Sequence, residues 1–435
     1  MADKKYYNIP SGSMILGEGA YYSTDCYKTQ LNNNVVVVGT SGAGKTIGIV
    51  KPTLLQAEGS YIISDPKGNL ARDYGPYLEE KGYKIVKMDF IHPGRSTRYN
   101  PITRCKTPDD ALKLASSIVF EIGHGARMCD PFWPKSEQMM IVSMISYLTE
   151  TEEIREEEKN ISTLIKLANE AKREGANNRI SPLSERMEDH EMLMRYNGKE
   201  SFAASRFRDF NSSPEKTHNT IIMTALTDLC MYDTPEMRKM MSGNDIDFTA
   251  VGREKTAVFV EVSDTDRSKD MLVNLFYSQM MNELCSYADE RCPDSRLPIP
   301  VRFILDDFAT NARINNFENI ISNIRSRNIS TMIFLQSEAQ LAAKYGDNAQ
   351  TIIDNCNTYV YMGGSDPNQA HKVALRADKS TNTILNMPLM HSWIFRRGQQ
   401  PVMCHNIDLE KLEKDKGYVK PEFTEELRDE PIFDQ

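Results

Sequence analysis

The sequence predicts an α/β fold with a mostly parallel sheet, interrupted by an inserted all-α domain. Short apolar runs alternate with helical stretches over residues 35–90, and the same alternation returns from residue 256 onward. Between these two parts, residues 103–249 show helical periodicity without strand signals. Apolar strands that alternate with helices are typical of a parallel sheet covered on both faces. We therefore expect one α/β domain whose chain is split by a long helical insertion.

The first part of the α/β domain follows residues 1–30, which mix Tyr, Gly and Ser without periodicity. The apolar run Val35–Val38 ends at a glycine and predicts the first strand. Pro52 predicts a kink or local break in the next helix, because proline lacks a backbone N–H. The elements expected in order are a strand at 35–39, a helix at 45–57, a strand at 60–65, a helix at 70–81 and a strand at 83–90.

The insertion is expected to contain helices only. Asp109 and Asp110 favour a helix start, because carboxylates stabilise the positive end of the helix dipole. Phe132, Trp133 and the pair Met139 and Met140 are interpreted as core of this domain, with a substrate-docking surface as the alternative. The expected helices are 109–120, 134–149, 160–172, 182–195 and 214–231.

The second part of the α/β domain resumes the alternation. The segment TAVFVEVS is rich in β-branched and apolar residues, as buried strands are, and VRFILDDF has the same character up to its two carboxylates. The expected elements are a strand at 256–263, a helix at 268–290, a strand at 301–308, a helix at 316–326, strands at 331–337 and 358–363, and a helix at 365–375.

The composition is that of a soluble globular protein. Of 435 residues, 40% are hydrophobic and 26% charged. The longest apolar stretches fall far short of the ~20 residues that a membrane span needs. The eight cysteines form no C-x-x-C pair, so we expect reduced thiols. The net charge of −9 argues against nonspecific coating of nucleic acid by the whole surface, but not against a local basic channel.

A complete phosphate-binding motif, G-x-x-x-x-G-K-[ST], follows the first strand and opens a helix, which is the context that this motif requires. Its glycines let backbone N–H groups close around phosphate oxygens at a helix N-terminus. We expect Lys45 to reach the β- and γ-phosphates and Thr46 to hold Mg²⁺. The motif consists of Gly39, Thr40, Ser41, Gly42, Ala43, Gly44, Lys45 and Thr46.

Such a loop needs an acidic partner for Mg²⁺ at the end of a neighbouring strand. Asp306 and Asp307 follow a buried apolar run, at the strand edge where open α/β sheets bind ligands. We expect Asp306 to hold Mg²⁺ and Asp307 to orient or activate the attacking water. Asp65 also ends an apolar strand and is the rival metal ligand, with a loop cap as its structural alternative.

Three further polar residues are candidates for the reaction. Gln336 closes the strand that follows, where its amide can contact the γ-phosphate or the water; a bond to backbone is the alternative. Arg325 and Arg327 precede that strand. An arginine placed at a neighbouring subunit's nucleotide stabilises the charge on the transferred phosphoryl group. A surface arginine pair is the alternative.

Over residues 32–365 the chain resembles the TraG/TraD-type coupling ATPases of conjugation and type IV secretion, which are relatives of the FtsK and HerA DNA motors. The phosphate-binding motif is generic, whereas the DPKG segment, the LQS-x-A-Q-L segment and the helical insertion between them are more specific. The segments that carry the resemblance are NNNVVVVGTSGAGKT, KPTLLQAEGSYIISDPKGNL, RYNPI, DPFWPKSEQMMIVSMISYL, KTAVFVEVSDTD, VRFILDDFAT, IRSRNISTMIFLQSEAQL and NCNTYVYMGG.

The resemblance implies a RecA-like motor domain that hydrolyses ATP with Mg²⁺ and assembles as a homohexamer, although a monomer in isolation stays open. It implies partners as well: a relaxase or relaxosome with single-stranded DNA, and components of a type IV secretion channel. It places the protein in the bacterial cytoplasm, at the cytoplasmic face of the inner membrane. The implied domains are 1–102 (first nucleotide-binding part), 103–249 (all-α, substrate selection), 250–425 (second nucleotide-binding part) and 426–435 (acidic tail).

Carried onto this sequence, Lys45 and Thr46 match Walker A, Asp306 the Walker B aspartate and Gln336 the third motif of the family. Two departures stand out. Asp307 replaces the usual glutamate, and the usual transmembrane helices are absent, as in a truncated chain or in a soluble member that reaches the membrane through a partner. Two other functions stay open: an FtsK/HerA-like DNA pump without a secretion partner, and a substrate adaptor that uses nucleotide only to assemble.

Overall fold

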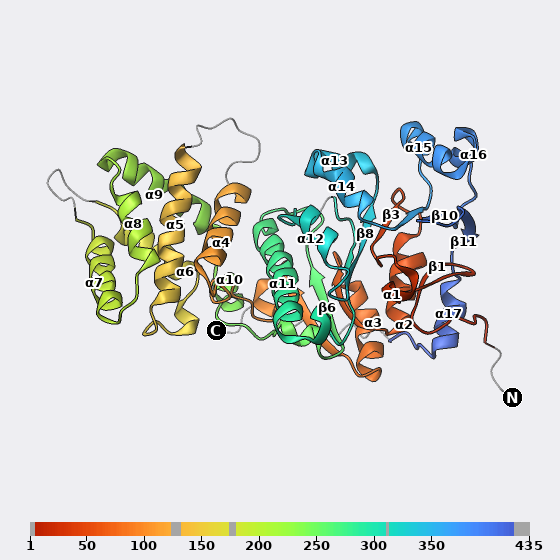
Figure 1. The fold of residues 1–435 in the computed structure, drawn as a ribbon, viewed down its shortest axis with the longest axis horizontal. Coiled ribbons are helices and arrows are strands. Elements are labelled where there is room, and N and C mark those ends of the chain that lie inside the picture. Colours follow the sequence, from red (N-terminus) through yellow and green to blue (C-terminus); the bar gives the residue numbers. More distant parts are fainter. Residues whose placement is uncertain (1–4, 123–131, 174–179, 310–312, 422–435) are drawn as a thin grey trace.

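The computed structural model describes residues 5–122, 132–173, 180–309 and 313–421. Figure 1 shows two bodies side by side: an α/β domain on the right, and a bundle of helices on the left. The bundle is formed by the chain between β5 (Lys84–Asp89) and β6 (Thr256–Glu261), and no strand occurs among the described residues of that stretch. The α/β domain with an all-helical insertion, as the sequence predicts, is confirmed.

The central sheet has the strand order β11-β10-β9-β3-β8-β7-β4-β6-β5. Its strands from β9 to β5 pair in parallel, and β10 pairs antiparallel with both β9 and the edge strand β11. The mostly parallel sheet is therefore confirmed. The remaining strands of this sheet are β3 (Val35–Val38), β4 (Ser60–Ser64), β7 (Val301–Leu305), β8 (Ile329–Leu335), β9 (Thr358–Tyr361), β10 (His391–Arg396) and β11 (Val402–His405).

Both faces of the sheet are buried, which explains the continuous apolar runs. In β3, Val36 and Val38 pack into the core on one face, whereas Val35 and Val37 pack into the core on the other. The helices that complete the domain are α2 (Lys51–Gln56), α3 (Asn69–Glu80), α11 (Asp270–Arg291), α12 (Phe317–Asn323), α13 (Glu338–Tyr345), α14 (Asn348–Asp354), α15 (Pro367–Ala377), α16 (Thr381–Leu385) and α17 (Leu409–Lys416).

The helix after β3 is irregular where the sequence predicts a break. A π-helical turn at Thr46–Val50 leads directly into α2, which contains Pro52. Because proline donates no backbone hydrogen bond, a regular helix cannot form all of its bonds across this point. The chain keeps helical dihedral angles on both sides of the junction, so the irregularity widens the helix instead of ending it.

The helical bundle is built around α5 (Phe132–Glu150), whose residues from Met140 to Leu148 are all buried. Phe132 and Trp133, at the start of this helix, are 46% and 40% exposed, so the prediction that they belong to the core is wrong. Met140 is fully buried, as predicted. The other helices of this region are α4 (Pro108–Ile122), α6 (Ile161–Glu170), α7 (Pro182–Tyr196), α8 (Phe202–Asn211), α9 (Glu215–Cys230) and α10 (Pro235–Met240).

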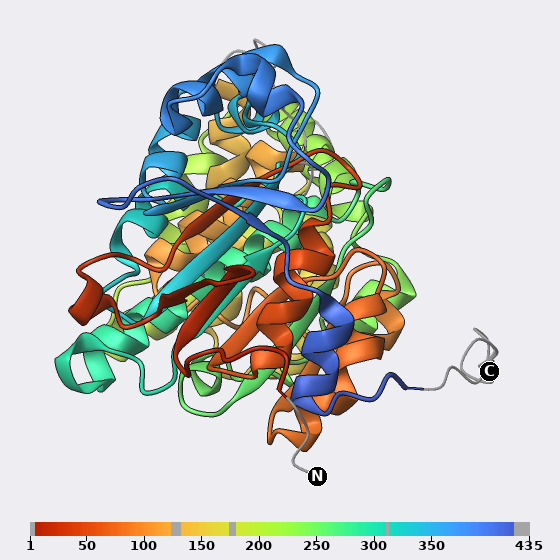
Figure 2. The same cartoon turned by 90° about the vertical axis from the view of Figure 1, so that its right-hand side faces the viewer.

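Several elements have no counterpart in the sequence prediction. A separate two-stranded sheet pairs β1 (Ser13–Gly17) with β2 (Ala20–Ser23), and the short helix α1 (Cys26–Thr29) follows it. The antiparallel strands β10 and β11 close the sheet in front of the viewer in Figure 2, which looks from the side away from the bundle. Among the described residues, no helix combines the length and hydropathy needed to cross a membrane.

Candidate nucleotide-binding site

The phosphate-binding motif forms a tight loop between β3 and the π-helical turn. Gly42 and Gly44 have φ angles of 80° and 85°, a left-handed conformation that glycine adopts without strain. A side chain at Gly39 would stand 3.0 Å from Ala43 Cβ. The loop is also tied to neighbouring strands, because Gly39 N donates to Leu335 O at 3.0 Å. The glycines are thus required by the shape of the loop itself.

Lys45 is folded back onto this loop. Its Nζ donates to the carbonyl oxygens of Gly39 at 2.7 Å and Thr40 at 3.3 Å. The side chain is buried, and burial lowers the pKa of Lys45, while the carboxylates of Asp307 and Asp306 act in the opposite direction. A cation is therefore held inside the loop at the point where a phosphate group would need one.

Thr46 and Asp306 meet at the same edge of the sheet. Thr46 Oγ1 donates to Asp306 Oδ2 at 3.1 Å, although the two residues lie far apart in the sequence. The contact follows from the sheet, in which only β8 separates β3 from β7. Burial and the nearby charge of Asp307 raise the pKa of Asp306, while the hydrogen bond from Thr46 lowers it.

Asp307 and Gln336 complete this cluster. Asp307 has a φ of 47°, a left-handed angle that aspartate tolerates better than most side chains, and its N–H donates to Asp306 Oδ1 at 3.0 Å. Gln336, which directly follows β8, donates from Nε2 to Asp307 Oδ1 at 3.4 Å. Lys45, Thr46, Asp306, Asp307 and Gln336 are therefore brought together at one strand edge.

Asp65 has a different position. It follows β4, and its Oδ2 accepts a hydrogen bond from Ala71 N at 2.8 Å, in the first turn of α3. Burial raises the pKa of Asp65, whereas hydrogen bonds from the α3 backbone lower it. Its carboxylate thus caps α3, while the hydroxyl of Thr46 bonds to Asp306 instead.

Because of Glu261, at the end of β6, we expect the stability of the folded protein to depend on pH. Burial raises its pKa from 4.5 to about 7, with smaller contributions from the charges of Asp89 and Asp65. Between about pH 4.5 and pH 7, Glu261 is therefore protonated in the folded state and ionised in the unfolded state. Because the folded state binds more protons in this window, the free energy of unfolding decreases as the pH rises through it. We expect Glu261→Gln to raise the Tm by about 2 °C at pH 8 and by less than half of that at pH 5.

Thermal melts at the two pH values test this, with the exposed Glu254→Gln as the matched control. An equal change in Tm at both pH values for Glu261→Gln would contradict the raised pKa of Glu261. It would indicate a packing effect that does not depend on the charge of this side chain.

The two arginines lie at the opposite edge of the sheet, near the amino end of β8. Arg325 Nη2 donates to Cys26 O at 3.0 Å, and Arg327 holds Asp289 through two hydrogen bonds of 2.9 Å and 2.7 Å. Within one chain, neither arginine lies in the cluster around Thr46. A role at a nucleotide for either of them therefore requires a neighbouring subunit.

Asn406 packs against the phosphate-binding loop. It is 1% exposed, and its Nδ2 has no hydrogen-bond partner among the described residues. A methyl group at Gly44 would stand 3.6 Å from that Nδ2. The side chain is oriented by Ser392 Oγ, which donates to Asn406 Oδ1 at 2.6 Å. No motif marks this residue, because only the β10–β11 hairpin brings it to the loop.

The fold and the site together define an α/β protein with a phosphate-binding loop and an all-helical insertion. The structure is similar to the bacterial conjugative coupling protein TrwBdeltaN70, with a TM-score of 0.66 and 15% identity over 93% of this chain and 95% of that one. It is also similar to TrwB solved with ADP and Mg²⁺, with a TM-score of 0.65 and 14% identity over 92% of this chain and 90% of that one.

Residues 3–405 match the family described as type IV secretory system conjugative DNA transfer, and the chain belongs to this family. Protein VirD4 of Rhizobium radiobacter is 24% identical over 345 residues, which cover 76% of this chain and 46% of VirD4. Conjugal transfer protein TraG of Escherichia coli is 22% identical over 339 residues, or 74% of this chain and 52% of TraG. The chain thus spans about half the length of these relatives.

Proposed function

We propose that this chain hydrolyses ATP to drive a relaxase–DNA or protein substrate toward a type IV secretion channel. The observation that carries the proposal is the hydrogen bond between Thr46 Oγ1 and Asp306 Oδ2 at the mouth of the phosphate-binding loop. It joins the two side chains that a Mg²⁺–nucleotide site requires, from strands on either side of β8. Membership of the conjugative DNA transfer family supports the same activity.

The cluster suits Mg²⁺ and a nucleotide. Hydroxyl and carboxylate oxygens are the ligands that Mg²⁺ prefers, and Thr46 and Asp306 offer one of each. Mg²⁺, when bound, supplies positive charge against the phosphates. The loop from Gly39 to Thr46 presents backbone N–H groups to them, and Lys45 leaves the carbonyls of Gly39 and Thr40 to meet the β- and γ-phosphates.

Asp307 and Gln336 are assigned to the attacking water. Their side chains contact each other, so together they can hold a water molecule in line with the γ-phosphate. Asp65 stays with α3, and this geometry favours Asp306 as the metal ligand. The arginine that completes the catalytic site, Arg325 or Arg327, would come from the next subunit of a homohexamer.

The helical insertion is assigned to substrate selection. Phe132 and Trp133 form an edge-to-face pair at the start of α5, and both are exposed. Exposed aromatic pairs of this kind are favoured at protein interfaces. We assign this pair to the docking of a relaxase or an accessory protein, at the cytoplasmic face of the inner membrane. The insertion also argues against a simple DNA pump of the FtsK/HerA kind.

A second candidate function is a substrate adaptor that binds nucleotide only to assemble. Asp307 favours this function, because its side chain is one methylene shorter than the glutamate that is usual in the TraG/TraD-type coupling ATPases. A rate of turnover that depends on Lys45 would exclude the adaptor.

Capture of a nucleoprotein substrate tests the proposed recruitment. We expect the full chain to retain a purified relaxase bound to its single-stranded DNA, and the double variant Phe132→Ser/Trp133→Ser to retain at least tenfold less. Basal ATP hydrolysis of the double variant is expected to stay unchanged. Lys45→Ala serves as the matched control, because it should lose turnover and keep capture. Equal capture by the wild-type chain and the double variant would contradict the docking assignment.

A further inference from the structure

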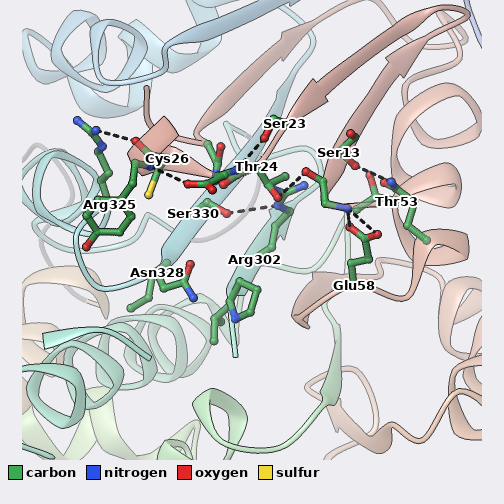
Figure 3. Close-up of a pocket in the computed structure, with 18 of the residues that line it drawn as sticks. Ser13, Ser23, Thr24, Cys26, Thr53, Glu58, Arg302, Arg325, Asn328 and Ser330 are labelled. Carbon is green, nitrogen blue, oxygen red and sulfur yellow. Dashed lines mark hydrogen bonds between the residues drawn. The ribbon is translucent and has the colours of Figure 1, made fainter. Parts of the chain in front are cut away.

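A polar cavity lies at the edge of the sheet opposite the phosphate-binding loop. Its volume is about 720 Å³, which is in the range of small-molecule sites. Its walls come from the start of β1, from α1, from the end of α2 and from the amino ends of β4, β7 and β8. Figure 3 shows Arg302 and Arg325 entering it from different elements.

Three arginines line this cavity. Arg302 contacts only Ser330 Oγ, through Nε at 3.3 Å, so its two terminal nitrogens make no hydrogen bond with the described residues. Arg325 uses one nitrogen for Cys26 O, at 3.0 Å. Arg296 lies over the ring of Tyr27 at 4.5 Å and donates to Asn328 Oδ1 at 3.3 Å. Most of their donors therefore remain available in the cavity.

The carboxylates of the cavity are already used by the backbone. Both oxygens of Glu58 accept the N–H of Gly12 at 3.0 Å. Asp25 caps α1 by accepting the N–H groups of Tyr27 and Lys28 at 3.1 Å. Lys28 pairs with Asp25 at 3.6 Å, so the three arginines face Glu58 as the one other acid among the lining residues. An excess of positive charge in a recess is the arrangement that concentrates anions.

Arg302 is half-buried in the cavity wall, and burial lowers the pKa of its guanidinium, against the opposing effect of the neighbouring Tyr61 and Glu58. A charged group held this way is stabilised by an anion that brings its own hydrogen-bond acceptors.

We propose that this cavity is a binding site for a small phosphorylated ligand, such as a nucleotide or a sugar phosphate. Arg302 binds the phosphate oxygens, and Arg296 adds a second guanidinium to the same cavity wall. Guanidinium groups match phosphate geometry through paired N–H donors. The site is distinct from the P-loop, and the proposal does not depend on the proposed function.

The observations favour a small ligand over a nucleic-acid strand. A strand is held along an open groove by backbone contacts and by aromatic side chains that stack on successive bases. Here the arginines line one recess between β1, α2 and the strand ends, and Arg296 occupies one face of the ring of Tyr27. We therefore treat binding of a strand as an outcome that would overturn the proposal.

Calorimetric titration of pyrophosphate tests the site in a Lys45→Ala chain, in which the P-loop is disabled. We expect one binding event per chain, weakened at least tenfold by adding Arg302→Gln. The matched control Arg186→Gln, on the helical insertion, should change the affinity less than twofold. If ADP binds more tightly than pyrophosphate, the ligand is a nucleotide. If the two bind with equal affinity, the ligand is a simpler phosphate compound. Absence of binding, equal affinity after Arg302→Gln, or displacement of pyrophosphate by a single-stranded DNA oligomer would overturn the proposal.

Thermal melts separate a ligand site from a structural role for Arg302. Removing a half-buried charge that forms no ion pair among the described residues should leave the Tm of the ligand-free chain unchanged or higher. Pyrophosphate should raise the Tm of Lys45→Ala, because a ligand that binds only the folded state stabilises it, and should not raise that of the double variant. A Tm lowered by more than about 5 °C in the ligand-free Arg302→Gln chain would show a structural residue instead.

Discussion

Lys45→Ala is expected to lower steady-state ATP hydrolysis by at least about 10²-fold. Lys45 is the buried cation of the phosphate-binding loop, and its Nζ rests on loop carbonyls from which it can turn toward phosphate. Its removal takes away the charge that would meet the transferred phosphoryl group, and alanine offers no hydrogen-bond donor in its place. Turnover under saturating ATP and Mg²⁺ is the measurement.

Lys51→Ala is the matched control for this variant. Lys51 opens α2, and its ammonium lies over the ring of Tyr74 at 5.6 Å rather than in the loop. We expect the control to keep turnover within about twofold and to lose only a little stability, as for a partly exposed cation–π contact. Equal rates for Lys45→Ala and the wild-type chain would show that the loop is not the catalytic site.

Asp307→Glu is expected to keep or raise the rate of ATP hydrolysis, by up to about 10²-fold. The longer side chain moves the carboxylate about one methylene toward the γ-phosphate position, and misplacement by ~1 Å costs on the order of 10²-fold in rate. The left-handed backbone at this position, with φ 47°, suits aspartate better than glutamate. We therefore expect a slightly lower Tm for this variant.

Asp307→Asn is the matched variant, because it keeps the shape and removes the charge. Turnover should fall in this variant while nucleotide binding remains, since Thr46 and Asp306 are untouched. A complete loss of turnover in Asp307→Glu would show that Asp307 does not occupy the catalytic position.

The parallel strands were predictable from the sequence because both of their faces are buried. Apolar runs such as Val35–Val38 predict strands even when the neighbouring strands are not known. The edge of the sheet was not predictable in this way. Strand β11 is largely exposed and β10 has polar ends, so their apolar signal is weak. Helix α8, with its alternation of Arg and Phe, and the short helices α13 and α14 were missed for the same reason.

The site could be predicted in part. The spacing of the phosphate-binding motif and the carboxylates after an apolar strand point to one sheet edge, and the structure brings Thr46 and Asp306 together there. The strand order, which places β8 between their strands, cannot be read from local patterns. The approach of Asn406 to Gly44 depends on a hairpin distant in sequence and leaves no local signal.

The proposed function is tested most directly by measuring ATP hydrolysis by the full chain with and without single-stranded DNA, with Lys45→Ala as the control. A DNA-driving ATPase should turn over faster with DNA, by severalfold or more, and the Lys45→Ala chain should show neither rate. A Lys45-dependent rate that single-stranded DNA leaves unchanged would contradict the claim that this chain couples hydrolysis to nucleic acid.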